Sequence, residues 1–170
     1  NIQDRFKQIR APIRWVKPSN LHLTLKFLGN ITEEQIEGAK KCLKEAGQGV
    51  NSFTLKTTET GGFPNLNYPK VLWLGFSDPD RQLHKLVENI EFQLQKKEFQ
   101  PESRKFTPHL TIGRIKSPKG KKDFIRMLHK EKNVSCDDIC VTCFKLIKSD
   151  LKPSGPEYSV LHTFNLKKAV

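Results

Sequence analysis

The sequence predicts an α+β fold of two pseudo-symmetric lobes, with antiparallel sheets lining a central cleft and helices on the outside. Three observations carry this prediction. The tetrapeptide His-Leu-Thr-Leu at residues 22–25 returns as His-Leu-Thr-Ile at residues 109–112. Each half of the chain also carries a long helical pattern among strand-like runs. No stretch of disordered composition separates the halves, so we expect residues 1–170 to form a single bilobal domain.

The bulk composition narrows the class of protein. Thirty Lys and Arg against eighteen Asp and Glu give 170 residues a net charge of +12. This excess suits a nucleic-acid or phosphate ligand, although a solvated basic surface would look the same. No run approaches the roughly 20 apolar residues that cross a bilayer, so we expect no membrane partner. The four cysteines do not resemble a disulfide framework, and a reducing cytoplasm is the expected location.

The first half of the chain alternates helical and strand patterns. Apolar residues at helical spacing predict the tail of an amphipathic helix over residues 1–10. Period-two alternation predicts a strand over residues 21–28, with His22, Thr24 and Lys26 on one face. Thr32 and Gln35 form a capping-box signature for a helix to about Ala46. Two strands then follow, with a turn-rich segment between them: residues 53–58 and 70–76.

The second half repeats this order. Residues 77–80 predict the start of a second long helix, whose inward stripe ends at Leu94. A loop leads to the second His/Thr strand over residues 107–113. Beyond it the sequence predicts a basic loop over 116–122, which either follows an RNA backbone or is simply solvated, and a short helix over 124–128. Two closing strands are predicted over 138–149 and 157–166, joined by a turn over 151–156.

The duplicated His/Thr pairs carry the chemistry. Residues i and i+2 of a strand point the same way, so each copy presents an imidazole and a hydroxyl together. Histidine exchanges protons near neutral pH, and two histidines across a phosphorus centre can act as general acid and general base. Threonine hydroxyls beside them can donate to phosphate oxygens whose charge grows in the transition state. The candidate catalytic residues are therefore His22, Thr24, His109 and Thr111, and this chemistry formally needs neither metal nor cofactor.

Two segments resemble the HxTx signature strands of the 2H phosphoesterase superfamily: Arg-Trp-Val-Lys-Pro-Ser-Asn-Leu-His-Leu-Thr-Leu-Lys-Phe-Leu-Gly at 14–29 and Phe-Thr-Pro-His-Leu-Thr-Ile-Gly-Arg at 106–114. The match is closer to the RNA 2′,3′-cyclic phosphodiesterase branch, also called 2′-5′ RNA ligase. Further matches lie at residues 62–65, 71–75 and 151–158. The family normally opens with a short apolar strand that this numbering lacks, and we expect truncation or disorder of that strand rather than a loss of function.

The resemblance implies a function and a set of roles. Such enzymes hydrolyse RNA-terminal 2′,3′-cyclic phosphate to a 2′-phosphomonoester, and some run a reverse joining reaction on tRNA halves. By analogy, His22 protonates the leaving 3′-oxygen and His109 is the general base for water, although the symmetric motif itself does not distinguish the two. Thr24 and Thr111 then hold the phosphate oxygens.

Two further residues are candidates for substrate binding. Arg114 follows the second motif, and strict alternation places it on the face opposite His109 unless the strand ends or bulges. Phe63, in a Gly-Gly-Phe-Pro turn, can stack on a nucleobase or fill the core, and the core is the preferred interpretation. Trp73 is interpreted as a packing residue. The Cys136, Cys140 and Cys143 spacing does not suit a zinc site.

Two other functions remain open from the sequence. The same chemistry on a small nucleotide-derived cyclic phosphate would use the same four side chains. A non-catalytic RNA or nucleotide binder could keep the cleft, but it would not need two imidazoles as proton carriers.

Overall fold

The chain divides into two units, each assembled from segments that lie far apart in the sequence. The computed structural model describes residues 2–7, 13–116, 125–126, 128, 137–153 and 155–168. The first unit comprises Asn1–Thr24, Leu55–Ser77 and Thr107–Asp138. The second comprises Leu25–Thr54, Asp78–Phe106 and Ile139–Val170. The single bilobal domain expected from the sequence stays a prediction.

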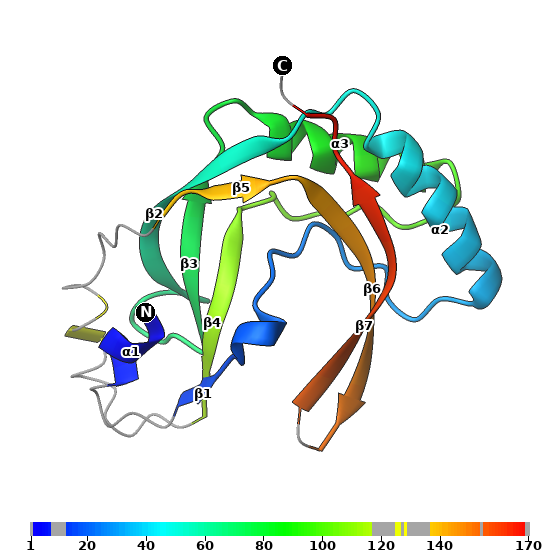
Figure 1. The fold of residues 1–170 in the computed structure, drawn as a ribbon. Helices are drawn as coiled ribbons and strands as arrows, with labels where there is room; N and C mark the ends of the chain where they lie inside the picture. The colour runs from blue at the N-terminus through cyan, green and yellow to red at the C-terminus, as the bar shows by residue number, and fades with distance from the viewer. Residues whose placement is uncertain are drawn as a thin grey trace. The chain divides into compact units, whose positions relative to one another are not determined.

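An antiparallel sheet organises the first unit (Figure 1). Its neighbouring strands are β1 (Ile13–Trp15), β4 (His109–Ile115), β3 (Val71–Ser77) and β2 (Phe53–Phe63), in that order, and β2 begins two residues earlier in the second unit. The short helix α1 (Ile2–Lys7) belongs to the same unit. The Gln3 side chain, itself buried, donates to the Val16 carbonyl at 2.8 Å and to the Ile112 carbonyl at 2.9 Å. These two hydrogen bonds tie α1 to the edge of the sheet.

The two faces of this sheet differ in character. Leu72, Leu74 and Phe76 alternate along β3 and are all buried. Ile112 of β4 and Phe6 of α1 are also buried, at 1% and 0% exposure. Trp73 and Gly75 point to the opposite face, because successive residues of a strand alternate. The face that carries Leu72, Leu74 and Phe76 therefore forms the core of this unit, and the face that carries Trp73 does not.

The second unit combines two helices with a long hairpin. Helices α2 (Glu33–Ala46) and α3 (Gln82–Gln95) pack against each other through apolar stripes. The hairpin strands β6 (Cys143–Lys152) and β7 (Gly155–Asn165) pair antiparallel, and the short strand β5 (Ile139–Val141) precedes them. Gly155 opens β7 with a φ of 124°, which a residue with a side chain rarely adopts. The turn predicted over 151–156 is too long, because β6 continues to Lys152 and β7 begins at Gly155.

Helix α2 begins as the sequence predicts, whereas α3 begins at Gln82, beyond the start predicted at residues 77–80. The capping box of α2 is complete: Gln35 donates its backbone N–H to the Thr32 hydroxyl, and Thr32 returns its N–H to the Gln35 side chain. At the start of α3, the Asp78 carboxylate accepts from the His84 backbone N–H at 2.9 Å and lies 2.8 Å from its ring Nδ1. Each side chain satisfies a donor that the first turn of a helix leaves open.

The strand predicted over residues 21–28 is wrong. Only Leu23 makes a strand-like contact, an isolated antiparallel bridge to Leu110. The chain passes into the second unit at Leu25. There Lys26 is buried in an ion pair with Glu91, and Phe27 is 77% exposed. Residues from Leu25 onward therefore belong to the second unit, and the pairing with β4 is limited to Leu23.

The strands predicted over 53–58 and 107–113 are confirmed as strands, but their bounds differ from the predicted ones. The first strand after α2 runs to Phe63, and the second His/Thr strand begins at His109 and ends at Ile115. The short helix expected over 124–128 and the basic loop over 116–122 lie largely outside the described residues. Within the described part of the chain, no helix has the length and apolar character needed to cross a membrane. The α+β class with antiparallel sheets is confirmed.

Candidate active site

A single turn before the first motif sets the orientation of His22. Pro18 begins the 3₁₀ turn η1 (Pro18–Asn20), because its fixed φ suits a first helical position. The Asn20 carbonyl at its end lies 2.7 Å from His22 Nδ1. A carbonyl oxygen only accepts, so Nδ1 carries the proton. The other ring nitrogen, Nε2, is then the atom that can exchange a proton with a ligand.

The second motif orients His109 in the same way. The Thr107 carbonyl lies 2.7 Å from His109 Nδ1. Pro108 lies between them; it keeps the preceding residue extended, and its carbonyl accepts from Phe76 N–H. Both histidines therefore bond the carbonyl two residues before them through Nδ1. Their identical orientation gives each imidazole an Nε2 that can act as a base when neutral and as an acid when protonated.

The bridge between Leu23 and Leu110 brings the two motifs side by side within the first unit. In an antiparallel pair, the residues flanking a bridge also face each other. Thr24 is therefore opposite His109, and His22 is opposite Thr111. In such a pair, opposed Cβ atoms lie roughly 5 Å apart and diagonal neighbours, as His22 and His109 are here, roughly 7–8 Å apart.

These four side chains share the face that the core does not use. Leu110 is paired with Leu74, a core residue, so Leu23 and Leu110 point to the core. His109 is paired with Gly75 and Thr111 with Trp73, both on the opposite face. A Cβ at position 75 would lie 2.8 Å from Thr58 Oγ1 and 3.1 Å from Trp73 Cζ3, so only glycine lets these side chains pack so closely there.

A β-bulge redirects Arg114 to this same face. The register between β3 and β4 passes from Trp73–Thr111 to Leu72–Gly113, so Ile112 has no partner on β3. The extra residue reverses the alternation beyond it. Arg114 is then paired with Val71, two residues from Trp73, and lies on the side of His109 and Thr111. Strict alternation would have placed this exposed guanidinium on the other side.

Aromatic rings border His109. The Phe63 ring meets the His109 ring edge-on, with centroids 5.0 Å apart, and the Trp73 ring is 6.4 Å away. Phe63 and Trp73 also contact each other at 5.4 Å. Phe63 is 37% exposed, so the preferred interpretation of it as a core residue is wrong. Its partner on β3 is Val71, which points away from the core.

Some features of this face are not evident from the sequence. Trp73 packs, as interpreted, but against the imidazole rather than in the core, and its buried indole Nε1 has no hydrogen-bond partner among the described residues. Arg14 was not singled out, yet it is paired with Arg114 on β1. The i−2 carbonyls of the two histidines were also missed. Every residue has a backbone carbonyl, so the residue type at that position gives no signal for this hydrogen bond.

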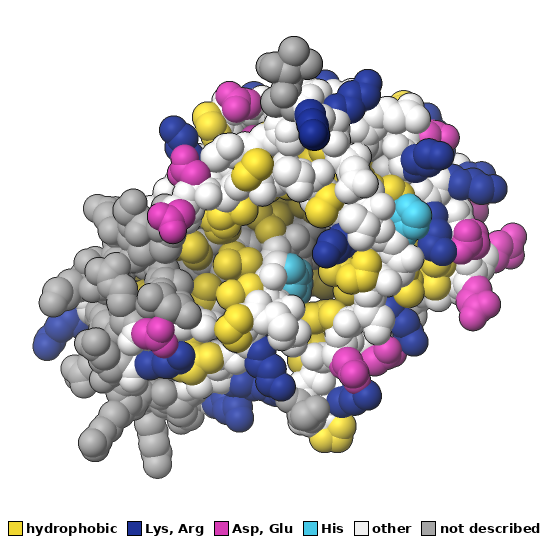
Figure 2. All heavy atoms as spheres, in the orientation of Figure 1, with side chains coloured by type: hydrophobic (Ala, Val, Ile, Leu, Met, Phe, Trp, Pro, Cys, Tyr) yellow, Lys and Arg dark blue, Asp and Glu magenta, His cyan; other side chains and the backbone are white. Residues whose placement is uncertain are grey.

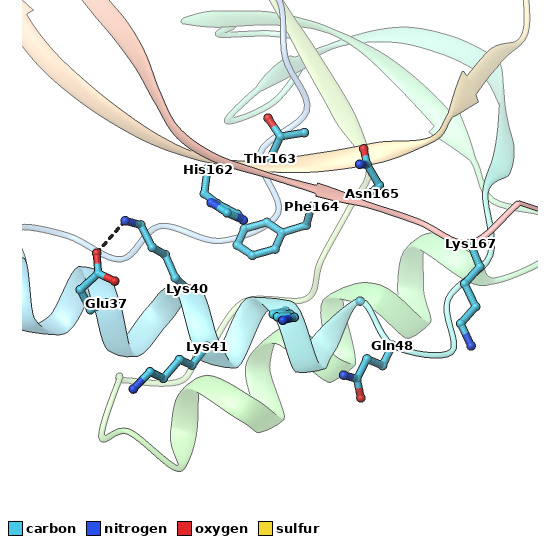
Figure 3. A pocket seen from close by; sticks show the side chains of 11 residues that line it. Glu37, Lys40, Lys41, Gln48, His162, Thr163, Phe164, Asn165 and Lys167 are labelled. Carbon is cyan, nitrogen blue, oxygen red and sulfur yellow. Dashed lines mark hydrogen bonds and ion pairs between the residues drawn. The ribbon is translucent and has the colours of Figure 1, made fainter.

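Cationic side chains also gather in the second unit. A pocket of about 480 Å³ lies between α2 and β7, lined by Lys40, Lys41, Lys44 and His162 (Figure 3). The Lys40 ammonium is 2.6 Å from Glu37 and lowers the pKa of that carboxyl. Both basic and acidic side chains lie over α2 in Figure 2. This mixture of signs is that of a solvated helix surface.

Possible metal ligands do not cluster in the described part of the chain. Among the described residues, no three His, Cys, Asp or Glu side chains come together. Cys140 and Cys143 are free thiols, whereas Cys136 lies outside the described residues.

Comparison with known proteins finds relatives along nearly the whole chain. The family model described as LigT like Phosphoesterase matches residues 1–73 and again residues 74–158. A protein of Aquifex aeolicus named RNA 2′,3′-cyclic phosphodiesterase is 38% identical over 169 residues, which cover 97% of this chain and 89% of the relative. A protein of the same name from Methanothermobacter thermautotrophicus is 33% identical over 165 residues, with the same coverage.

Solved structures are similar as well. TT0787 of Thermus thermophilus has a TM-score of 0.81 and 26% identity, covering 98% of this chain and 90% of that one. LigT of E. coli, solved in complex with 3′-AMP, has a TM-score of 0.72 and 25% identity, covering 98% and 89%. These neighbours agree with the α+β class that the sequence predicts.

Proposed function

The chain belongs to the LigT-like phosphoesterase family, and we propose that, like its curated relatives, it hydrolyses 2′,3′-cyclic phosphates at RNA ends. The single observation that carries the mechanism is the bridge between Leu23 and Leu110. It supports a site in which two His/Thr pairs flank one phosphate. The family resemblance stated from the sequence is confirmed by these relatives.

The proposed reaction divides proton transfer between the two histidines. Neutral His109 takes a proton from water, whose oxygen attacks phosphorus. The bond from phosphorus to the 3′-oxygen breaks, and protonated His22 gives its proton to that oxygen. The products are a 2′-phosphomonoester and a free 3′-hydroxyl. Hydrogen bonds from Nδ1 to backbone carbonyls support these roles, because they leave each Nε2 free for proton transfer.

The neighbouring side chains are assigned supporting roles. Thr24 and Thr111 donate to the non-bridging oxygens, whose charge increases as water attacks. Arg114 contributes a guanidinium, which suits a backbone phosphate of the RNA strand through two parallel hydrogen bonds. Phe63 offers a partly exposed ring to the terminal base. We further propose that no metal or cofactor takes part.

Single substitutions of the histidines test the mechanism directly. His22→Ala and His109→Ala should each lower turnover of a nucleoside 2′,3′-cyclic phosphate by about 10²–10⁴-fold, with a chelator present throughout. Product analysis of the unaltered protein should find the 2′-phosphate alone. Unchanged turnover in either variant, or loss of wild-type activity in chelator, contradicts the mechanism. Tight binding of the substrate without any product would instead identify a non-catalytic nucleotide binder.

The biological setting of the reaction is part of the proposal. Halves of tRNA with cyclic-phosphate ends are candidate substrates, and reverse 2′-5′ joining is a candidate side reaction. Incubating both halves with the protein and analysing the junction tests the second point. We place the reaction in the cytoplasm.

A further inference from the structure

The register between β1 and β4 in the first unit places two arginines directly opposite each other. Arg14 of β1 is the direct partner of Arg114 of β4. Opposed residues of an antiparallel pair point to the same face, and Arg114 lies on the side of His109 and Thr111. Both guanidinium-bearing residues are exposed. The reactive face therefore continues into a pair of positive charges.

Like charges directly opposite each other destabilise a pair of strands. Arg14 makes other contacts within the structure, and its partner across the β1–β4 ladder is Arg114. An anion between two guanidinium groups removes this repulsion and gains bidentate hydrogen bonds from each. The arrangement thus favours a bound phosphate.

The position of the pair identifies which phosphate it would bind. On β3, the partner of Thr111 is Trp73 and the partner of Arg114 is Val71, two residues further along. Two residues of a strand span roughly 6–7 Å. That is about the length of one sugar–phosphate unit, so a ligand with its cyclic phosphate at the histidines can reach the arginines with its next phosphate.

We propose that Arg14, together with Arg114, forms a subsite for the 5′-phosphate of the terminal nucleotide, so that the protein prefers RNA strands over nucleoside cyclic phosphates. This inference rests on the proposed function, since it assumes that the cyclic phosphate binds between His22 and His109. The phosphate in the subsite is an internal phosphodiester of the strand, or a terminal phosphomonoester when the substrate is one nucleotide long.

Three substrates distinguish phosphate binding at the subsite from hydrolysis of the cyclic phosphate. They are adenosine 2′,3′-cyclic phosphate, the same nucleoside with a 5′-phosphate, and a diadenosine nucleotide ending in the cyclic phosphate. With the unaltered protein, both substrates that carry the 5′-phosphate should have a kcat/KM at least about 10-fold higher than the bare nucleoside, mainly through a lower KM. Rates with a 5′-phosphate should also fall more steeply with salt.

Arg14→Gln should remove most of this preference, leave the bare nucleoside unaffected, and reduce the salt slope by about one unit. Arg14→Lys should keep the salt slope and lose part of the preference, because it keeps the charge but not the planar fork. The matched control is Lys7→Gln, which removes a charge from α1 in the same unit and should change neither quantity.

The outcomes are distinguishable. Equal use of all three substrates by the unaltered protein overturns the subsite but leaves the proposed function standing. An equal loss on all three substrates in both Arg14 variants shows a structural role and also overturns the subsite. No hydrolysis of any substrate by the unaltered protein overturns the proposed function and this inference together.

Discussion

The Phe63 ring meets the His109 ring edge-on, at a centroid distance of 5.0 Å and an interplanar angle of 82°. This geometry is favourable for aromatic rings, since the positive edge of one faces the negative face of the other. It holds the imidazole from the side while Thr107 holds Nδ1. Part of the Phe63 ring remains exposed beside the candidate site, where a nucleobase could stack on it.

Replacing Phe63 with Leu should lower kcat/KM for a cyclic-phosphate substrate by about 5–30-fold. A stacked base contributes about 1–3 kcal/mol, and leucine offers no aromatic face. Phe63→Tyr keeps the ring and should stay within about threefold of the unaltered protein. Thermal unfolding checks that both variants fold equally well. If the leucine variant matches the tyrosine variant in kcat/KM, the ring does not contact substrate.

The sequence predicts those features of the site that depend on side-chain alternation within one strand. It does not predict those that depend on how one strand pairs with another. The spacing of His109 and Thr111 places them on one face whatever their neighbours are. The face of Arg114 depends on the bulge at Ile112, which exists only relative to β3. Phe63 similarly contacts a residue far along the chain. The residues next to Arg114 and Phe63 in the sequence do not indicate which distant residues these two side chains meet.

The same distinction explains the outcomes for the fold. The capping box at Thr32 involves residues three positions apart, and it is confirmed. The strand over 21–28 satisfies the alternation rule equally well. It fails because Lys26 forms an ion pair with the half-buried carboxylate of Glu91, 65 residues away in the sequence. Long-range partners therefore overrule a correct local pattern.

The pH dependence should assign the roles of His22 and His109. If one imidazole must be charged and the other neutral, kcat/KM forms a bell. The acid loses its proton as pH rises, so His22→Gln should abolish the alkaline limb. The base gains a proton as pH falls, so His109→Gln should abolish the acidic limb. Rate profiles from pH 5 to 9 check this, and the opposite pattern would exchange the two roles.

The close packing of Trp73 over Gly61 makes a second region testable. A Cβ at position 61 would lie 2.1 Å from Cζ2 of Trp73, so Gly61→Ala must displace the indole. We expect a loss of about 1–3 kcal/mol in the free energy of unfolding, as in other overpacked sites. Activity should fall as well, because the displaced ring borders His109.

Gly38 provides the matched control for this substitution. It lies within α2, and a Cβ there would meet no atom within 4 Å. Gly38→Ala should therefore stabilise the protein by about 0.5–1 kcal/mol. Denaturant unfolding measures both variants. Equal effects of the two substitutions would show that contact with Trp73 does not limit position 61.

The ion pair between Lys26 and Glu91 should be the more costly of two pairs to break. The Lys26 ammonium lies 2.8 Å from both carboxylate oxygens and also donates to the Gln100 carbonyl at 2.9 Å. Its side chain is only 6% exposed and that of Glu91 only 22%. Glu91→Gln leaves the ammonium buried without its counter-charge, and we expect about 2–4 kcal/mol of destabilisation.

The Lys40–Glu37 pair of α2 is the exposed control, which shows how much of the destabilisation depends on burial of the ion pair. Its separation of 2.6 Å is even shorter than the 2.8 Å of the Lys26–Glu91 pair, but the Glu37 side chain is 66% exposed. Water and salt screen such a pair, so Glu37→Gln should leave the urea midpoint unchanged within error. Replacing Lys26 and Glu91 together by Met and Leu should recover much of the loss, because no unpaired charge then remains buried. A double variant no more stable than Glu91→Gln would show that the lost stability comes from something other than an unpaired buried charge.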